Sequence, residues 1–171
     1  MSGLPRAGVP EKSTGHLIRD SSLGLVEETL DPILELQALL WSGAPLRPAL
    51  VEMLRLRSAS AVNCVVCKAV RYDVARRDGL TEDKVAAVRG ERSDALTDEE
   101  RLVVAFADAY LNHPQRIDAK LRTELARTFT PAQLCHMALA IAFFNPMSKC
   151  AVSLGGMPDS FPLTEIPVPP R

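Results

Sequence analysis

Residues 52–71 read EMLRLRSASAVNCVVCKAVR, and most of what the chain reveals about its fold and chemistry lies in this stretch. It places Cys64 and Cys67 three residues apart, directly after Asn63. Asn is a favoured N-cap, so the pattern predicts a helix from Asn63 to about Asp78. Because residues three apart share one helix face, we expect the two sulfurs to lie side by side in the first turn.

This placement suits thiol chemistry. The N–H groups of a first turn and the helix dipole stabilise a thiolate and lower its pKa from the free value of about 8.5. A pair at this spacing can also close a disulfide without unwinding the helix. Two alternatives stay open, namely a pair of buried helical cysteines and a zinc site. The zinc alternative lacks a second CxxC or a pair of suitably spaced histidines.

Two charged residues are candidates for helping the cysteines. Arg71 follows Cys67 by four residues, so we expect its cation on the same face, where it would favour the thiolate. It could instead form a salt bridge, with Glu52 or Asp73. Glu52 is surrounded in sequence by apolar residues, so its carboxylate is expected to be partly desolvated, with a raised pKa suited to accepting a proton. The alternative for Glu52 is an ordinary solvated charge on a helix.

The rest of the chain is marked by helix start signals and shows no alternating strand pattern of useful length. Each signal is a capping residue, a proline in a first turn or, at Thr97 and Thr130, a capping box. We predict an all-α helical bundle of six to seven helices, with starts at Asp31-Pro32, Pro48, Asn63, Thr81, Thr97 and Thr130. One helix is expected to end at Asn145-Pro146, because proline disfavours helix interiors.

Composition divides the chain into three parts. Residues 1–22 mix Gly, Pro, Ser and charge and are predicted to form a flexible N-terminal arm. Residues 23–154 are predicted to form a single helical domain, and residues 155–171 form a tail with five prolines.

Bulk properties exclude several kinds of partner. A formal charge of -1 gives no electrostatic basis for binding nucleic acid. No apolar run approaches the roughly 20 residues needed to span a bilayer, so no membrane partner is expected. Four cysteines without a signal peptide favour the reducing cytoplasm.

Several segments resemble the alkylhydroperoxidase D-like, carboxymuconolactone decarboxylase superfamily. They lie within roughly residues 30–160, and the first contains a glutamate followed twelve residues later by a CxxC, as in the family motif. The segments are Glu52 with LRLRSASAVNCVVC, RRDGLTEDKVAAV, TDEERLVVAFADAY, FTPAQLCHMALAIAFFN and LGGMPD.

The resemblance implies specific roles. In the family the second cysteine attacks a peroxide, the first resolves it as a disulfide, and a glutamate and a histidine relay protons. Those roles fall on Cys67, Cys64 and Glu52, while Arg71 occupies the histidine position. The resemblance also implies a homo-oligomer, often a trimer or a hexamer, and requires no metal or organic cofactor.

The expected function is therefore a thiol-dependent peroxidase acting on a small hydroperoxide, with a thiol reductant protein as a partner. The replacement of histidine by Arg71 keeps two alternatives open. One is a cofactor-free lyase or isomerase acting on a lactone or a small carbonyl substrate. The other is a non-catalytic oligomeric binding protein.

Overall fold

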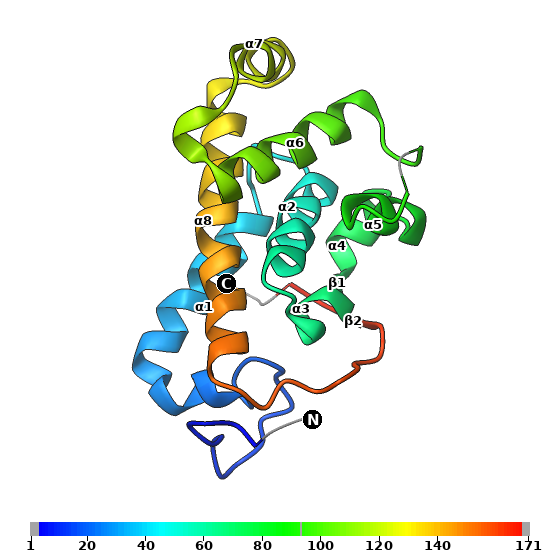
Figure 1. Ribbon diagram of the computed structural model, residues 1–171. Helices are drawn as coiled ribbons and strands as arrows, with labels where there is room; N and C mark the ends of the chain where they lie inside the picture. Colours follow the sequence, from blue (N-terminus) through cyan, green and yellow to red (C-terminus); the bar gives the residue numbers. More distant parts are fainter. Residues whose placement is uncertain (1–3, 93, 169–171) are drawn as a thin grey trace.

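The structure is a computed structural model that describes residues 4–92 and 94–168. At its centre lies α2 (Pro48–Ala61), which packs against α8 (Pro131–Ser153) and α6 (Asp98–Asn112) (Figure 1). Pro48 occupies the first turn of α2, where a missing N–H costs nothing. Because α2 is buried on almost every side, it forms the middle of the core.

The remaining elements surround this centre, and the all-α prediction is confirmed. The described residues contain eight α-helices, two 3₁₀ helices and two short parallel strands. In chain order the others are η1 (Ser22–Val26), α1 (Glu27–Trp41), α3 (Val65–Ala69), β1 (Val70–Tyr72), α4 (Asp73–Arg77), α5 (Glu82–Val88), η2 (Pro114–Arg116), α7 (Ala119–Thr128) and β2 (Thr164–Ile166). The predicted number of helices, six to seven, was too small, because α7 was not identified and one predicted helix is divided in two.

The divided helix is the one expected over residues 63–78. Asn63 has a positive φ of 53° and follows α2, so it ends that helix instead of starting the next one. The N–H of Asn63 bonds the Ser60 carbonyl, and the N–H of Cys64 bonds the Ala59 carbonyl. These two bonds are the pattern of a Schellman C-cap, in which Asn is tolerated in the left-handed conformation. Cys64 is the N-cap of α3, which is only one turn long.

Two other predicted boundaries were wrong because helices continue through prolines. Pro32 lies inside α1 and Pro146 lies inside α8. Each proline removes one backbone hydrogen bond. Phe144, Asn145 and Ser148 are buried beside Pro146, so packing of this helix outweighs the loss. The predicted capping boxes at Thr97 and Thr130 are both present.

The N-terminal arm lies against the segment that directly follows α8, below that helix in Figure 1. Pro5 forms an antiparallel bridge with Gly155, and the Arg6 N–H bonds the Leu154 carbonyl at 2.6 Å. Within the arm, Asp20 accepts hydrogen bonds from Ser13, Thr14 and Gly15, which lower its pKa to about 2. The arm predicted from composition therefore has a defined loop structure here.

The tail beyond α8 returns to the core and forms β2, which pairs in parallel with β1 in the register Val70 to Thr164 and Tyr72 to Ile166. This pairing was not predicted, since neither strand is long enough to show an alternating pattern. None of the helices in the described part of the chain is long and apolar enough to cross a membrane.

Candidate active site

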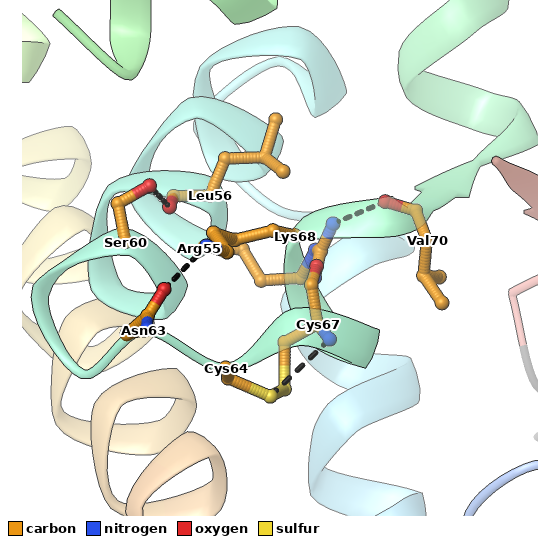
Figure 2. The surroundings of a disulfide bond; sticks show 8 residues. All are labelled: Arg55, Leu56, Ser60, Asn63, Cys64, Cys67, Lys68 and Val70. Atoms are coloured by element: carbon orange, nitrogen blue, oxygen red, sulfur yellow. Dashed lines mark hydrogen bonds between the residues drawn. A yellow bond between two sulfur atoms is a disulfide. The ribbon is translucent and has the colours of Figure 1, made fainter. Parts of the chain in front are cut away.

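The two cysteines of the CxxC are joined by a disulfide at the start of α3 (Figure 2). Their Cα atoms are 5.2 Å apart, and the Cys67 N–H donates to Cys64 Sγ at 3.2 Å. Cys64 is fully buried, whereas Cys67 is partly exposed. The predicted juxtaposition of the sulfurs is confirmed, and the two cysteines differ in access.

Glu52 and Arg55 form a buried ion pair behind the disulfide. Arg55 donates from Nε and Nη2 to the two carboxylate oxygens of Glu52, both at 2.7 Å. The Glu52 side chain has no exposed surface and that of Arg55 only 7%. Burial opposes the charge of Arg55, but the Glu52 carboxylate outweighs it and raises the pKa of Arg55. The expected partial desolvation of Glu52 is thus complete, and its partner is Arg55.

Arg55 links this ion pair to the cysteine backbone. It donates to the carbonyl of Cys67 and to that of Val70, both at 2.7 Å (Figure 2). Its guanidinium also lies over the ring of Tyr72, 5.5 Å from the centroid, within the range of a cation–π interaction. Sequence reasoning missed Arg55 as a site residue, although its spacing of three residues from Glu52 places the two on one helix face.

Cys67 borders a cavity of about 270 Å³. Cys64 and Glu52 are absent from its lining, so Cys67 is the cysteine that a bound molecule would meet. The lining comes from the arm, α1, α2, α3, β1, α8 and the tail, and is mainly apolar: Pro5, Val9, Leu17, Ile18, Ser21, Ser22, Leu23, Gln37, Arg55, Val66, Cys67, Val70, Tyr72, Phe143, Phe144, Met147, Ser148, Ala151, Leu154, Gly155, Gly156, Met157, Pro158 and Ile166.

Tyr72 and Gln37 bring further polar groups to the cavity. Both side chains are buried, and Gln37 Nε2 donates to the Tyr72 hydroxyl. Burial raises the pKa of Tyr72 to about 12, although the nearby Arg55 opposes this. No sequence signal marked Gln37, because α1 also carries Glu27, Glu28, Asp31 and Glu35. The position of Tyr72 depends on β1, which sequence reasoning did not identify.

Arg71 does not lie where the sequence predicted. The helix ends at Ala69, and in the following strand side chains alternate between two faces. Val70 and Tyr72 line the cavity, while Arg71 donates to Glu82 Oε1 at 3.1 Å, to Glu82 Oε2 at 3.0 Å and to the Lys68 and Val70 carbonyls. The predicted placement of Arg71 beside the thiol is therefore wrong, and the cation there is Arg55.

Other candidate groups lie outside this constellation. His136 is buried on α8, where burial lowers its pKa, and it does not line the cavity. Cys135 and Cys150 are free and exposed. Among the described residues, no group of three or more His, Cys, Asp or Glu side chains could hold a metal ion.

A family model described as the carboxymuconolactone decarboxylase family matches residues 27–109, which include Glu52, Arg55, both cysteines and Tyr72. This match supports the resemblance to the carboxymuconolactone decarboxylase superfamily that the glutamate and CxxC spacing indicated.

Two curated proteins are similar to this chain in sequence. The uncharacterized protein YnjA of Escherichia coli is 30% identical over 103 residues, which cover 60% of this chain and 57% of YnjA. The uncharacterized protein Rv2313c of Mycobacterium tuberculosis is 29% identical over 111 residues, which cover 64% of this chain and 39% of that protein. The chain thus spans little more than half of the first relative and less than half of the second.

Two solved structures share the fold of this chain, each at 21% identity. One is ATU0492 from Agrobacterium tumefaciens, a protein of unknown function with a suggested identity of antioxidant defence protein AhpD. It superposes on this chain with a TM-score of 0.64, and the superposition covers 80% of this chain and 94% of that chain. The other is a variant of the debrominase Bmp8 in complex with 2,3,4-tribromopyrrole, with a TM-score of 0.63, covering 81% of this chain and 75% of that chain.

Proposed function

We propose that the protein is an enzyme, a dithiol peroxidase that reduces a small organic hydroperoxide at Cys67. The observation that carries this proposal is the difference between the two cysteines. Cys67 borders an apolar cavity, and Cys64 is buried within bonding distance of it. A nucleophile that faces the substrate and a resolving partner behind it are what a dithiol peroxidase needs.

The reaction begins from the reduced pair. The Cys67 thiolate attacks the outer oxygen of the hydroperoxide, the O–O bond breaks, and the organic product leaves as an alkoxide that takes up a proton. Cys67 is then a sulfenic acid. The Cys64 thiol attacks the Cys67 sulfur, the disulfide forms and water leaves. The two thiols have supplied the two electrons that reduce the O–O bond.

Arg55 is the cation that favours the Cys67 thiolate in this proposal. Its guanidinium bonds the Cys67 carbonyl at 2.7 Å, and a nearby positive charge lowers a thiol pKa. Glu52 holds Arg55 through both carboxylate oxygens and lies outside the cavity lining. This geometry supports a positioning role for Glu52, and the proton relay expected from the family motif stays a prediction.

The proposal also includes the setting of the reaction. Reduction of the disulfide requires a dithiol, which we assign to a thiol reductant protein in the cytoplasm. A homo-oligomer, a trimer or a hexamer, is supported by exposed apolar side chains on two helices. Leu36 and Leu39 on α1 and Leu139 on α8 are each about half exposed or more.

The test counts thiols in a Cys135→Ser/Cys150→Ser background, which removes the two exposed thiols. The first protein tested is this background with Cys64 and Cys67 both present. After it has been reduced and desalted, cumene hydroperoxide should oxidise both remaining thiols. Cys64→Ser should accumulate a sulfenic acid that dimedone labels, whereas Cys67→Ser should react with neither reagent. Two thiols surviving a tenfold excess of hydroperoxide would overturn the proposal. Labelling of Cys67→Ser instead would reverse the two roles.

The position of the Arg71 side chain favours a second candidate function. In the family motif this position carries a proton-relaying histidine, whereas here the guanidinium is bound to Glu82. A lyase or isomerase acting on a lactone or a small carbonyl acid would not need the relay or the thiols. Turnover of such a substrate by Cys67→Ser would support this candidate over the peroxidase.

A further inference from the structure

The cavity beside Cys67 combines an apolar wall with one polar corner. Leu17 from the arm, Phe143 and Met147 from α8 and Ile166 from β2 form part of the apolar wall. Gln37, Arg55 and Tyr72 form the polar corner. A site of this composition selects a ligand that is mostly hydrocarbon and carries few polar atoms.

Most hydrogen-bond donors in the polar corner already have an acceptor within the protein. Arg55 uses four of its five N–H groups on Glu52 and on the Cys67 and Val70 carbonyls. Gln37 Nε2 donates to the Tyr72 oxygen. The Tyr72 hydroxyl is therefore the acceptor in that bond, and no hydrogen bond in the described residues uses its hydrogen.

We propose that the Tyr72 hydroxyl donates this hydrogen to an oxygen of the bound ligand, and that it is the proton donor to the alkoxide released when Cys67 attacks. The ligand class is an aryl or branched alkyl hydroperoxide, whose carbon skeleton occupies the apolar wall. The catalytic half of this proposal rests on the proposed peroxidase function. The binding half does not.

The chemistry of the phenol agrees with this role. Burial raises the pKa of Tyr72 to about 12, so the hydroxyl keeps its hydrogen at neutral pH. Proton transfer to an alkoxide is favourable, because an alkoxide is a stronger base than a phenolate. The phenolate oxygen then retains the bond from Gln37 and faces the Arg55 cation, and it recovers its proton from water. Arg55 cannot act in this way, because a guanidinium does not release its protons in proteins.

Binding tests the hydrogen bond without any peroxide. The probes are 2-phenyl-2-propanol, its methyl ether and tert-butylbenzene, measured by NMR titration of the disulfide form. Tyr72→Phe should weaken binding of the alcohol and the ether by about 3- to 10-fold, the usual value of one hydrogen bond, and leave tert-butylbenzene unchanged. Tyr110→Phe on α6 is the matched control, because Tyr110 is the second tyrosine and lies outside the cavity lining.

The affinities of the three probes for the wild-type protein provide a test that does not depend on the folding of Tyr72→Phe. The ether accepts a hydrogen bond but cannot donate one, so it should bind about as well as the alcohol and more tightly than tert-butylbenzene. Binding of the ether no tighter than the hydrocarbon would overturn the proposal. So would equal affinities of wild type and Tyr72→Phe for the alcohol.

Single-turnover kinetics test the proton transfer. With cumene hydroperoxide, Tyr72→Phe should oxidise about 100-fold more slowly than wild type, the order expected for loss of a general acid. Alkylation of Cys67 by iodoacetamide should be unchanged, since iodide leaves without a proton. An unchanged rate with cumene hydroperoxide would overturn the catalytic half. A wild-type protein inert to hydroperoxides would remove the peroxidase function, while the probe titrations would still decide whether Tyr72 binds the ligand oxygen.

Discussion

Glu52 and Glu100 are both carboxylates without exposed side-chain surface, but their cations differ. Glu52 pairs with Arg55, whose side chain is 7% exposed and reaches the backbone of Cys67. Glu100 pairs with Lys84 and Arg47, whose side chains are 23% and 36% exposed. One ion pair is enclosed and contacts the backbone of Cys67, and the other opens to solvent.

The difference separates two uses of a buried charge. Glu100 completes the capping box of α6 by accepting from the Thr97 N–H, so its burial serves a helix end. Within the described part of the chain, Glu52 accepts hydrogen bonds from Arg55 alone, and Arg55 reaches from α2 to the cysteine segment. An enclosed pair has no solvent to replace a lost partner, so removing one member leaves an uncompensated charge.

The largest expected effect follows from that enclosure. Glu52→Leu and Arg55→Leu should each lower the free energy of unfolding by about 3–5 kcal/mol, because each leaves one buried charge unpaired. The double variant should be clearly more stable than the sum of the two losses predicts, as urea denaturation of the disulfide form can measure. Additive losses would show that the two side chains do not act as a pair.

Glu100→Gln should lower the free energy of unfolding by a smaller amount, about 1–2 kcal/mol, since solvent can rehydrate Lys84 and Arg47. Burial disfavours the charge of Glu100, but hydrogen bonds from Lys84 and the Thr97 N–H prevail and lower its pKa. A lowered pKa in the folded state means that this stability is present above the unfolded pKa and is lost as pH falls through the folded one. Wild type should therefore lose its advantage over Glu100→Gln in acid, as urea midpoints at pH 7 and pH 3 would reveal.

Thr97→Ala should lower the free energy of unfolding by about 1 kcal/mol, the usual effect of losing an N-cap. It removes the hydroxyl that accepts from the Glu100 N–H and leaves both cations in place. Thermal unfolding should register the loss, while the rate of Cys67 alkylation stays at the wild-type value. A change in that rate would mean that the two glutamate centres are coupled.

Arg71→Ala should have no effect on the pH midpoint of Cys67 alkylation, because the Arg71 guanidinium is engaged with Glu82 and the backbone. Arg76→Ala, which removes another cation paired with Glu82, is the matched control. A rise of about one pH unit for Arg71→Ala alone would place its charge beside the thiol after all.

The features that sequence predicted are local ones. The capping boxes at Thr97 and Thr130 each need only four consecutive residues, and both are present. The pairing of Cys64 with Cys67 likewise follows from a spacing of three. Asn63 was misassigned because Asn is favoured both before a helix and, in the left-handed conformation, after one.

The strand pairing and the orientations of Arg71 and Tyr72, which sequence missed, depend on distant partners. Val70–Tyr72 becomes a strand because Thr164–Ile166 pairs with it, and no pattern within either segment reveals the other. That strand turns Arg71 away from the cavity and Tyr72 toward it. The role of Arg55 followed a local rule that was available, since it lies one turn from Glu52 and could have been predicted as its partner.

The pairing of β1 with β2 also sets an order of events in the cell. Segments near the N-terminus fold first during synthesis, so α2 and both cysteines emerge from the ribosome well before Thr164 exists. Joining such distant segments requires closing a long loop, which is entropically costly and slow. The nascent chain therefore has a period in which the tail does not yet line the cavity beside Cys67. The cavity beside Cys67 acquires its complete lining, which includes Ile166, only after the last strand has been translated.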